Sequence, residues 1–155
     1  MTTIGLGLAI VSTGLWSGLL LTLTTILHPV YAAQDDRGFA TELGLFLPVA
    51  RRSPTNYLLV TGMLVGPVLA IIGLPTGVPL VLTVVGLVLV VAGPLLVSRF
   101  AAEPNYDVIL GWDPAAVPAG WLATRRRYFA LNWVRGVCTW AAFGLFLAAA
   151  YIDLR

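Results

Sequence analysis

The polar side chains best suited to chemistry lie on one face of the last apolar stretch of the chain. Residues three and four apart share one face of a helix. In this stretch that spacing connects one set of polar and aromatic residues: Trp121, Arg125, Tyr128, Asn132, Arg135 and Thr139. Cations and amides inside an apolar span are unfavourable to bury and usually mark function. We therefore expect the functional site along this face.

Arg135 is the first catalytic candidate because it lies inside the apolar span. A fixed guanidinium there could stabilise a phenolate, an enolate or a carboxylate as negative charge develops. A structural clasp on backbone carbonyls is an equally good interpretation. Asn132 and Tyr128 could bind the same substrate or a dioxygen-derived anion, or they could hold Arg135 in place.

His28, the one histidine of the chain, comes at the end of the first apolar stretch. Imidazole titrates near neutral pH, so His28 could be a general base. It could also be an interfacial histidine that is hydrogen-bonded to a neighbouring helix. Thr13, Ser17 and Thr24 share its face, which we expect to contact other helices rather than lipid. Pro29 is expected to end or kink this helix.

Aromatic and cationic residues near the same membrane boundary could contribute to substrate binding. Trp112, Trp121 and Trp133 could sandwich a flat aromatic ligand, although an interfacial aromatic belt also predicts tryptophans there. The arginines at 125–127 are most simply an anchor to lipid headgroups, and of these only Arg125 falls on the polar face. The remaining substrate-binding candidates are Tyr57, Arg99 and Asn105.

We expect neither a metal nor another cofactor. Glu103, Asp107 and Asp113 could join His28 at a metal ion, but one histidine, one distant cysteine and no spaced ligand pair make a poor metal signature. The sequence has no glycine-rich phosphate loop and no Ser-His-Asp arrangement. The net charge is only +2 and the arginines flank apolar stretches, so we do not expect a nucleic-acid partner.

Membrane-spanning helices must position these residues. The chain has 155 residues, of which 59% are hydrophobic and 10% are charged, and its mean hydropathy is +0.92. A soluble domain carries about a quarter charged residues. Apolar runs long enough to cross about 30 Å of hydrocarbon recur along the chain. We predict one all-α domain over 1–155, a four-helix transmembrane bundle with spans at about 4–30, 56–74, 80–98 and 128–152.

Two polar segments, 31–56 and 99–127, are expected to form a cap of loops on one side of the membrane. Residues 39–50 have the spacing of a short interfacial helix. Ser53-Pro54 is typical of a helix start, a capping residue followed by proline in the first turn. A seam of small residues in the second span predicts close approach of another helix: Gly62, Gly66, Ala70 and Gly73.

The distribution of arginine predicts the orientation of the chain in the membrane. Seven of the nine cations lie in the two polar segments: Arg37, Arg51, Arg52, Arg99, Arg125, Arg126 and Arg127. The positive-inside rule places those segments in the cytoplasm and both termini outside. We expect a multi-pass protein of a bacterial plasma membrane. Candidate residues from all four spans then lie at one level of the membrane, where one site could use them together: His28, Asn56, Tyr57, Arg99, Asn132 and Arg135.

A pattern of residues in the last third of the chain points to a family. The pattern consists of Trp112-Asp113-Pro114, Pro118, Trp121, Arg125, Arg127, Asn132 and Arg135. It resembles the C-terminal signature of the anthrone oxygenase-like family of small four-helix membrane proteins. The length and the number of spans agree with that family over the whole chain. One departure is Pro104-Asn105, which follows directly where the family pattern has a residue in between.

Characterised members of that family oxidise anthrones to anthraquinones with dioxygen, apparently without a metal or flavin. The resemblance implies cofactor-independent oxidation of a hydrophobic phenolic or polycyclic substrate that arrives from the membrane. His28 would act as the base, and Arg135 with Asn132 would stabilise the resulting anion. The alternatives are a non-enzymatic membrane scaffold or lipid-binding subunit, and a channel, for which four spans leave little room without association of several copies. Self-association of the chain is left open.

Overall fold

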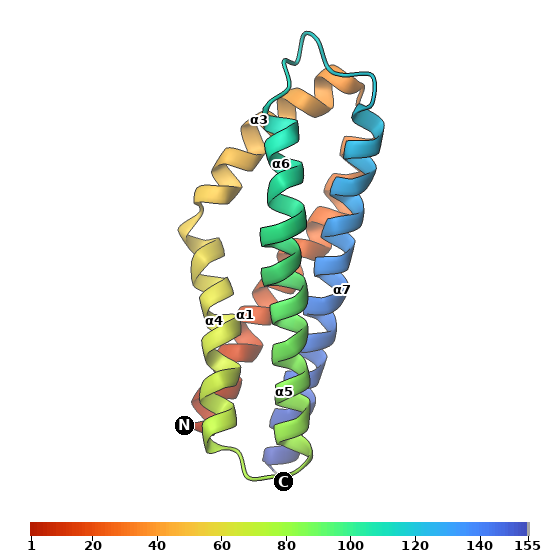
Figure 1. Cartoon of the computed structure of the whole chain (residues 1–155). Coiled ribbons are helices and arrows are strands. Elements are labelled where there is room, and N and C mark those ends of the chain that lie inside the picture. The colour runs from red at the N-terminus through yellow and green to blue at the C-terminus, as the bar shows by residue number, and fades with distance from the viewer. Residues whose placement is uncertain (155) are drawn as a thin grey trace.

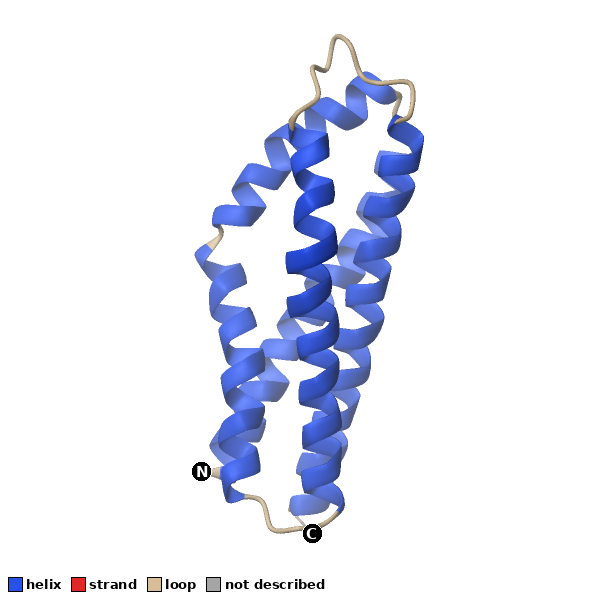
Figure 2. Ribbon diagram, in the orientation of Figure 1, coloured by secondary structure: helices blue, strands red, loops and turns tan. Residues whose placement is uncertain are grey.

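The computed structural model describes residues 1–154, and that part of the chain contains helices and turns but no strand (Figures 1 and 2). The elements in order are α1 (Thr2–Thr22), η1 (Leu23–Leu27), α2 (His28–Ala32), α3 (Asp36–Arg52), α4 (Pro54–Gly73), α5 (Val78–Val90), η2 (Val91–Ala102), α6 (Glu103–Leu110) and α7 (Trp121–Asp153). The two η elements are π-helical segments within longer continuous helices.

Four of these helices are long and apolar enough to cross a membrane: Thr2–Ala32, Pro54–Gly73, Val78–Leu110 and Trp121–Asp153. They pack side by side as one elongated bundle, with α4 against α1 and α5 against α7 (Figure 1). The predicted all-α transmembrane bundle is therefore confirmed. Both termini lie at the end of the bundle opposite the cap (Figure 1).

The cap consists mostly of helix, whereas the sequence had suggested loops. The third long helix does not end near Ser98 but continues through η2 and α6 to Leu110, and α7 begins at Trp121. The loop expected over 99–127 is thus reduced to the turn at 111–120. The reason is that hydropathy marks where an apolar run ends, while a helix continues until a breaker such as Gly111 interrupts it.

Helix α3 crosses the top of the bundle as an amphipathic helix, in agreement with the helical spacing of 39–50. Asp35 caps its first turn by accepting a hydrogen bond of 2.8 Å from the amide of Gly38. One face is buried in the cap and consists of Phe39, Ala40, Leu43 and Leu47. The next helix starts as predicted, because the Ser53 hydroxyl accepts a hydrogen bond from the amide of Asn56 and Pro54 occupies the first turn.

Pro29 does not end the first long helix, which continues to Ala32. A proline in a helix removes one backbone donor, and its ring crowds the carbonyl four residues earlier. The π-helical segment Leu23–Leu27 lies directly before Pro29 and widens the helix there. The third long helix shows the same combination, because Pro94 lies within η2. Both helices therefore accommodate a proline near the cap through a wider turn.

Helices α1 and α4 approach so closely that only glycine fits at their contact. A Cβ atom at Gly66 would lie 2.6 Å from the backbone nitrogen of Ala9 and 2.9 Å from the carbonyl oxygen of Gly5. A Cβ atom at Gly5 would lie 2.5 Å from the backbone nitrogen of Ala70. The small-residue seam predicted in the second span is therefore the surface on which α1 packs.

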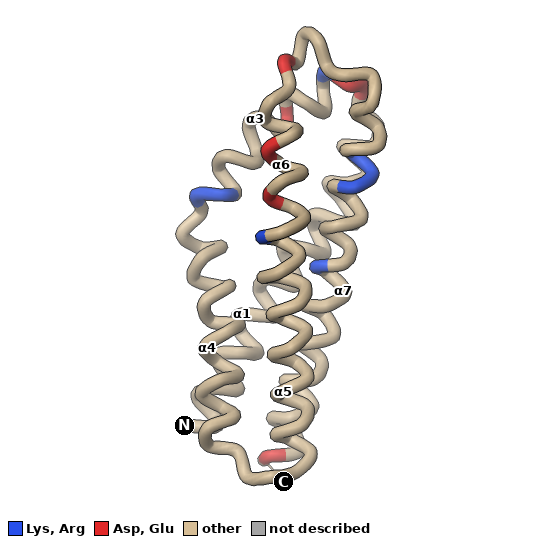
Figure 3. Tube along the Cα trace, in the orientation of Figure 1, with Lys and Arg blue, Asp and Glu red and all other residues tan. Residues whose placement is uncertain are grey.

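The bundle is longer than a membrane is thick at every helix except α4. With a rise of about 1.5 Å per residue, the 20 residues of α4 span about 30 Å, the thickness of the hydrocarbon core. The other three long helices have 31 or 33 residues. Their extra turns form the cap together with α3, and most of the charged residues lie in that half of the bundle (Figure 3). We therefore expect the α3–α4 junction to lie near the membrane boundary.

Candidate functional site

Arg135 is a buried cation that has no carboxylate partner in residues 1–154. Its residue is 9% exposed, and the only ion pairs in this part of the chain belong to Arg51. The Arg135 Nη1 donates hydrogen bonds to the Tyr106 hydroxyl at 2.8 Å and to Asn132 Oδ1 at 3.1 Å. Its Nε is buried and has no hydrogen-bond partner. The guanidinium lies 5.9 Å from the centre of the Trp16 ring.

Asn132 connects Arg135 to His28. The Asn132 Nδ2 lies 3.3 Å from His28 Nε2. Because a guanidinium can only donate, the amide oxygen must face Arg135 and the amide nitrogen must face His28. His28 Nε2 then accepts this hydrogen bond, so the proton of the neutral ring is on Nδ1. His28 Nδ1 is itself buried without a partner.

His28 packs between α7 side chains and does not reach the cavity described below. It is 4% exposed, and its ring stacks on Phe129 with the ring centroids 4.2 Å apart. The Tyr128 ring is 5.8 Å away. The sequence-based expectation that His28, Asn132 and Arg135 lie together thus matches their placement. Any effect of His28 on a ligand in the cavity must pass through neighbouring side chains such as Asn132 and Tyr128.

A cavity of about 740 Å³ lies beneath the cap and beside Arg135. Typical small-molecule sites measure about 300–1,000 Å³, so the space suits a polycyclic molecule. The apolar part of its wall comes mainly from the first long helix and α3: Trp16, Leu19, Leu20, Leu23, Leu27, Phe46 and Leu47. Its polar part comes from the other helices and from the end of α3: Arg51, Asn56, Tyr57, Ser98, Arg99, Glu103, Tyr106, Asp107, Tyr128 and Arg135.

Arg51 joins α3 to α6 at the edge of this cavity. Its Nη2 lies 2.7 Å from Glu103 Oε2 and 2.7 Å from Asp107 Oδ1. The Tyr57 hydroxyl donates a hydrogen bond of 2.7 Å to the carbonyl oxygen of Arg51. Partial burial lowers the pKa of Arg51, but the hydrogen bond with Asp107 and the charge of Glu103 outweigh this and raise the pKa above its ordinary value. The guanidinium therefore stays charged and holds the cap against α6.

Arg125 clasps the chain that leaves α2. Its Nη1 donates to the carbonyl oxygens of Tyr31, Ala32 and Gln34 at 3.2, 3.3 and 3.2 Å. Its guanidinium lies 4.5 Å from the centre of the Trp121 ring. These contacts belong to the packing of the cap, so Arg125 stabilises the fold at this end of the bundle.

Trp112, Trp133 and Asn105, which the sequence predicted as substrate-binding residues, also lie outside the cavity wall. Trp112 packs against Phe39 at a ring distance of 6.4 Å. Trp133 is 44% exposed and meets the Trp140 ring edge-on on the outer face of α7. The Asn105 Nδ2 donates to the carbonyl oxygen of Thr124 at 3.4 Å. None of these side chains is positioned to sandwich a ligand in this cavity.

Four of the sequence-predicted site residues line the cavity, namely Tyr57, Arg99, Tyr128 and Arg135. The others do not: His28, Asn105, Trp112, Trp121, Arg125, Asn132 and Trp133. Sequence reasoning missed Tyr106 and Arg51 as site residues and considered Glu103 only as a possible metal ligand. Helical spacing connects Arg99 to Glu103 and Glu103 to Tyr106, so this face would have been visible had the segment been read as a helix.

The residues described in this structure offer no ready metal site. Between Met1 and Leu154, no group of three or more His, Cys, Asp or Glu side chains is placed to hold a metal ion. Glu103 and Asp107, the carboxylates that line the cavity, are already bound by Arg51.

No family model, curated protein or solved structure matches this chain. The geometry of the cavity and the pattern of the C-terminal residues are therefore the features that bear on function.

Proposed function

We propose that this protein is an integral membrane oxygenase that oxidises a hydrophobic phenolic or polycyclic, anthrone-like substrate with dioxygen and without a cofactor. The observation that carries this proposal is the Arg135 guanidinium, which lies buried in the wall of an apolar cavity without an anionic partner. A buried cation without a counter-charge is strongly unfavourable. A bound phenolate would supply that charge, and an aromatic ring system would fill the apolar space.

The reaction converts the CH₂ group of an anthrone, which lies between two aromatic rings and opposite the ketone in the central ring, into a carbonyl. A base removes one C–H proton, and the negative charge is delocalised onto the oxygen of the substrate. Transfer of one electron to dioxygen and recombination at the same carbon form a C–O bond and leave a peroxide anion, which takes up the proton. Loss of the second C–H proton with cleavage of the O–O bond gives the carbonyl and releases the other oxygen atom as water.

Arg135 and Tyr106 are suited to stabilise the oxyanion in this sequence. Arg135 supplies a fixed positive charge at the position where the anion forms. The Tyr106 hydroxyl accepts a hydrogen bond from Arg135, so its own proton is free to be donated to the substrate oxygen. Asn132 Oδ1 accepts a second hydrogen bond from the same Nη1 and helps to hold the guanidinium in place. An apolar wall excludes water and strengthens these interactions.

We assign the proton transfer to Glu103 and replace the sequence-based assignment of His28 as the base. Glu103 lines the cavity and lies one helical turn from Tyr106; its Oε2 is paired with Arg51, which leaves Oε1 to accept the proton. His28 lies outside the lining, and its Nε2 is occupied by the amide of Asn132. His28 is therefore a positioning residue that orients Asn132, which in turn holds Arg135.

Quinone formation tests the proposal. The purified protein is incubated with an anthrone in air, and the absorbance of the quinone is followed. Arg135→Gln removes the charge that stabilises the oxyanion and is expected to lower kcat/KM by about 100-fold or more. Arg126→Gln, an exposed position outside the cavity, serves as the matched control and should leave the rate unchanged. Equal rates for the wild type, both variants and buffer would refute the oxygenase.

A lipid-binding subunit without catalysis is the second candidate. It is favoured by the position of the cavity beside the α3–α4 junction, where lining residues such as Tyr57 and Leu95 are exposed toward the membrane. Saturable binding of anthrones without turnover, together with loss of binding in Arg135→Gln, would support this second function.

A further inference from the structure

Buried polar atoms without a hydrogen-bond partner gather around one cavity. Residues 1–154 contain seven such side-chain atoms, and four of them belong to residues that line the cavity: Trp16 Nε1, Arg51 Nε, Ser98 Oγ and Arg135 Nε. Buried polar groups in folded proteins nearly always have a partner. All four atoms can donate a hydrogen bond. These four donors therefore lack acceptors, which a ligand rich in oxygen atoms would provide.

These donors occupy two positions. Trp16 and Arg135 form the inner pair, because the guanidinium lies 5.9 Å from the indole ring. Ser98 belongs to an outer group with its neighbour Arg99, and Arg51 binds Glu103, one helical turn after Arg99. Arg99 is exposed and forms no ion pair with any residue of the described chain. A phenolic oxygen at Arg135 would leave the outer group without an acceptor.

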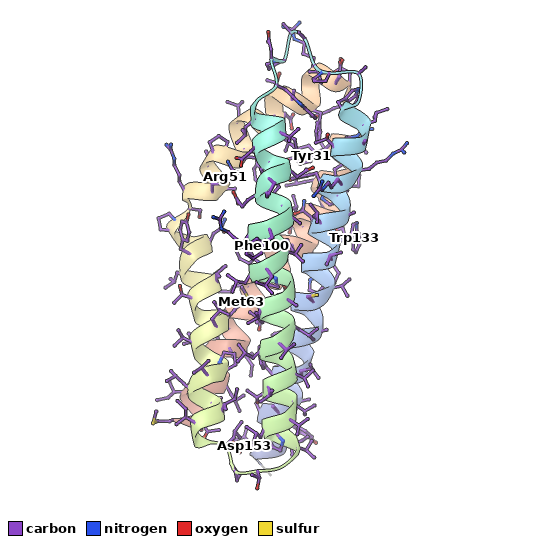
Figure 4. All side chains as sticks on the ribbon, viewed as in Figure 1. Tyr31, Arg51, Met63, Phe100, Trp133 and Asp153 are labelled. Atoms are coloured by element: carbon purple, nitrogen blue, oxygen red, sulfur yellow. The ribbon has the colours of Figure 1, made fainter. Side chains whose placement is uncertain are left out.

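The outer group lies at the level of the lipid headgroups. The α3–α4 junction marks the end of the 30 Å of hydrocarbon that α4 spans, at about 1.5 Å per residue. Arg51 precedes this junction by two residues. Three residues that line the cavity beside this junction are exposed: Tyr57 on α4, and Leu95 and Arg99 on η2. Figure 4 shows Arg51 and Phe100 on the two helices that flank this side. An amphiphile in a bilayer places its acidic group at this depth.

We propose that the ligand of this cavity is an acidic amphiphile with two oxygen-bearing ends. Its apolar body fills the cavity, one oxygen binds Arg135, and a carboxylate or phosphate at the mouth binds Arg99 and Ser98 and accepts from Arg51 Nε. The inference rests on the proposed function and names the substrate class of the same site. Arg99 is then the residue that selects acidic over neutral substrates.

A matched pair of ligands tests the outer group. Anthraquinone-2-carboxylate and its methyl ester share the ring system and the quinone oxygens, but only the first carries an acid. Binding is measured by quenching of Trp16 fluorescence in phosphatidylcholine nanodiscs, and Trp16→Phe identifies the signal of that residue. The acid is expected to bind at least 10-fold more tightly than the ester. Arg99→Gln should remove this difference, while Arg52→Gln, an exposed neighbour of the mouth that does not line the cavity, should retain it.

The outcomes separate this inference from the proposed function. Equal affinities of wild type for the two ligands, or a preference for the acid that survives Arg99→Gln, would overturn the acidic site. The acidic site would also be overturned if Arg135→Gln, but not Arg99→Gln, removed the preference for the acid, because the acid would then bind at the inner position. Quinone formation could still occur in that case, so the oxygenase would not be refuted. A preference that depends on Arg99 without any quinone formation would support the acidic site and refute the oxygenase.

Nanodiscs with phosphatidylglycerol distinguish two sources of the acidic group. Loss of the acid's advantage in these nanodiscs would assign the mouth to the headgroup of an anionic lipid. Retention of the advantage would assign it to a free acidic molecule. Both results support the same chemistry at Arg99, since either anion must displace neutral lipid from that position.

Discussion

At the scale of single residues, the amide of Asn132 determines the direction of the hydrogen bonds that link Arg135 and His28. Its oxygen accepts from Arg135 and its nitrogen faces His28, so one side chain fixes both the guanidinium and the tautomer of the histidine. This arrangement satisfies Asn132 but leaves the charge of Arg135 uncompensated. In the proposed function a bound ligand supplies the missing anionic partner, so changes at Asn132 should affect ligand binding more than folding.

Asn132→Asp should weaken the binding of a ligand oxygen at Arg135 while the protein remains folded. The aspartate keeps the shape of asparagine and places a negative charge about 3 Å from Arg135, where it competes with the ligand oxygen. We expect at least a 10-fold loss of affinity, about 1.4 kcal/mol, for both anthraquinone-2-carboxylate and its methyl ester, because both present the same quinone oxygen to Arg135. Fluorescence titration measures the effect, and Arg126→Gln is the control. An unchanged affinity for both ligands would show that Arg135 does not contact them.

His28→Phe should reduce oxidation only moderately. Phenylalanine keeps the stacking on Phe129 but removes the acceptor for Asn132. Loss of a positioning contact is expected to lower kcat by about 10-fold or less, whereas loss of a general base lowers rates by about 10²–10⁴-fold. Glu103→Gln is the comparison and should show the larger effect. If the two variants exchanged these magnitudes, His28 would be the base after all.

The tautomer of His28 can be measured directly because the chain has only one histidine. The hydrogen bond with Asn132 places the ring proton on Nδ1. Nitrogen-15 NMR of histidine-labelled protein should therefore give one protonated Nδ1 and one unprotonated Nε2. The opposite pattern would mean that the Asn132 amide is reversed, and Arg135 would then face an NH₂ group.

At the scale of helices, the sequence predicted the apolar spans better than the cap. Apolar runs are visible in a single chain because the membrane imposes their length, and the spans near 4–30 and 56–74 agree closely with the observed helices. Residues 99–110 carry mixed polarity, and their helix is stabilised by packing against α3, which lies far away in the sequence. Tyr106 was missed, and Glu103 was considered only as a possible metal ligand, because a segment read as a loop has no defined face.

The contact between α1 and α4 should tolerate no side chain at Gly66. A Cβ atom there would meet backbone atoms of Ala9 and Gly5, so the helices would have to separate. We expect Gly66→Ala to destabilise the protein by about 1–3 kcal/mol. Gly7→Ala on α1 is the matched control, because a Cβ atom at Gly7 meets nothing within 4 Å. Unfolding in mixed micelles, followed by circular dichroism, should separate the two variants; equal stability would place the helix contact elsewhere.

Arg51 should control how firmly α3 lies on the bundle. Its two ion pairs are partly exposed, so their joint contribution is about 1 kcal/mol. Arg51→Met should therefore raise amide hydrogen exchange in α3 by about 5-fold and leave exchange in α5 unchanged. Arg52→Met, at the exposed neighbouring position, is the control. Equal exchange in α3 for both variants would show that apolar packing alone holds the cap.

At the scale of the whole molecule, the two ends of the bundle differ in charge and in the number of candidate functional residues that they carry. Within residues 1–154 the charged side chains lie mostly in the half that carries the cap, and the opposite end of this part of the chain shows little charge besides Asp153 (Figures 3 and 4). The convergence of candidate residues from several helices on this half followed from the sequence, because their common level depends only on span boundaries. The rotation of each helix about its own axis decides which side chains line the cavity. Hydropathy does not determine that rotation.

The arginine-rich cap is expected to face the cytoplasm, with both termini outside. This orientation can be tested in a Cys138→Ala background with single cysteines at exposed positions at the two ends of the bundle. Thr76→Cys lies in the α4–α5 turn, and Ala119→Cys lies in the turn before α7. A membrane-impermeant maleimide should label Thr76→Cys in sealed cells and Ala119→Cys only in inside-out vesicles. The reverse pattern would place the cap, and with it the polar mouth of the cavity, on the outer surface, so that acidic ligands would reach Arg99 from the outer leaflet.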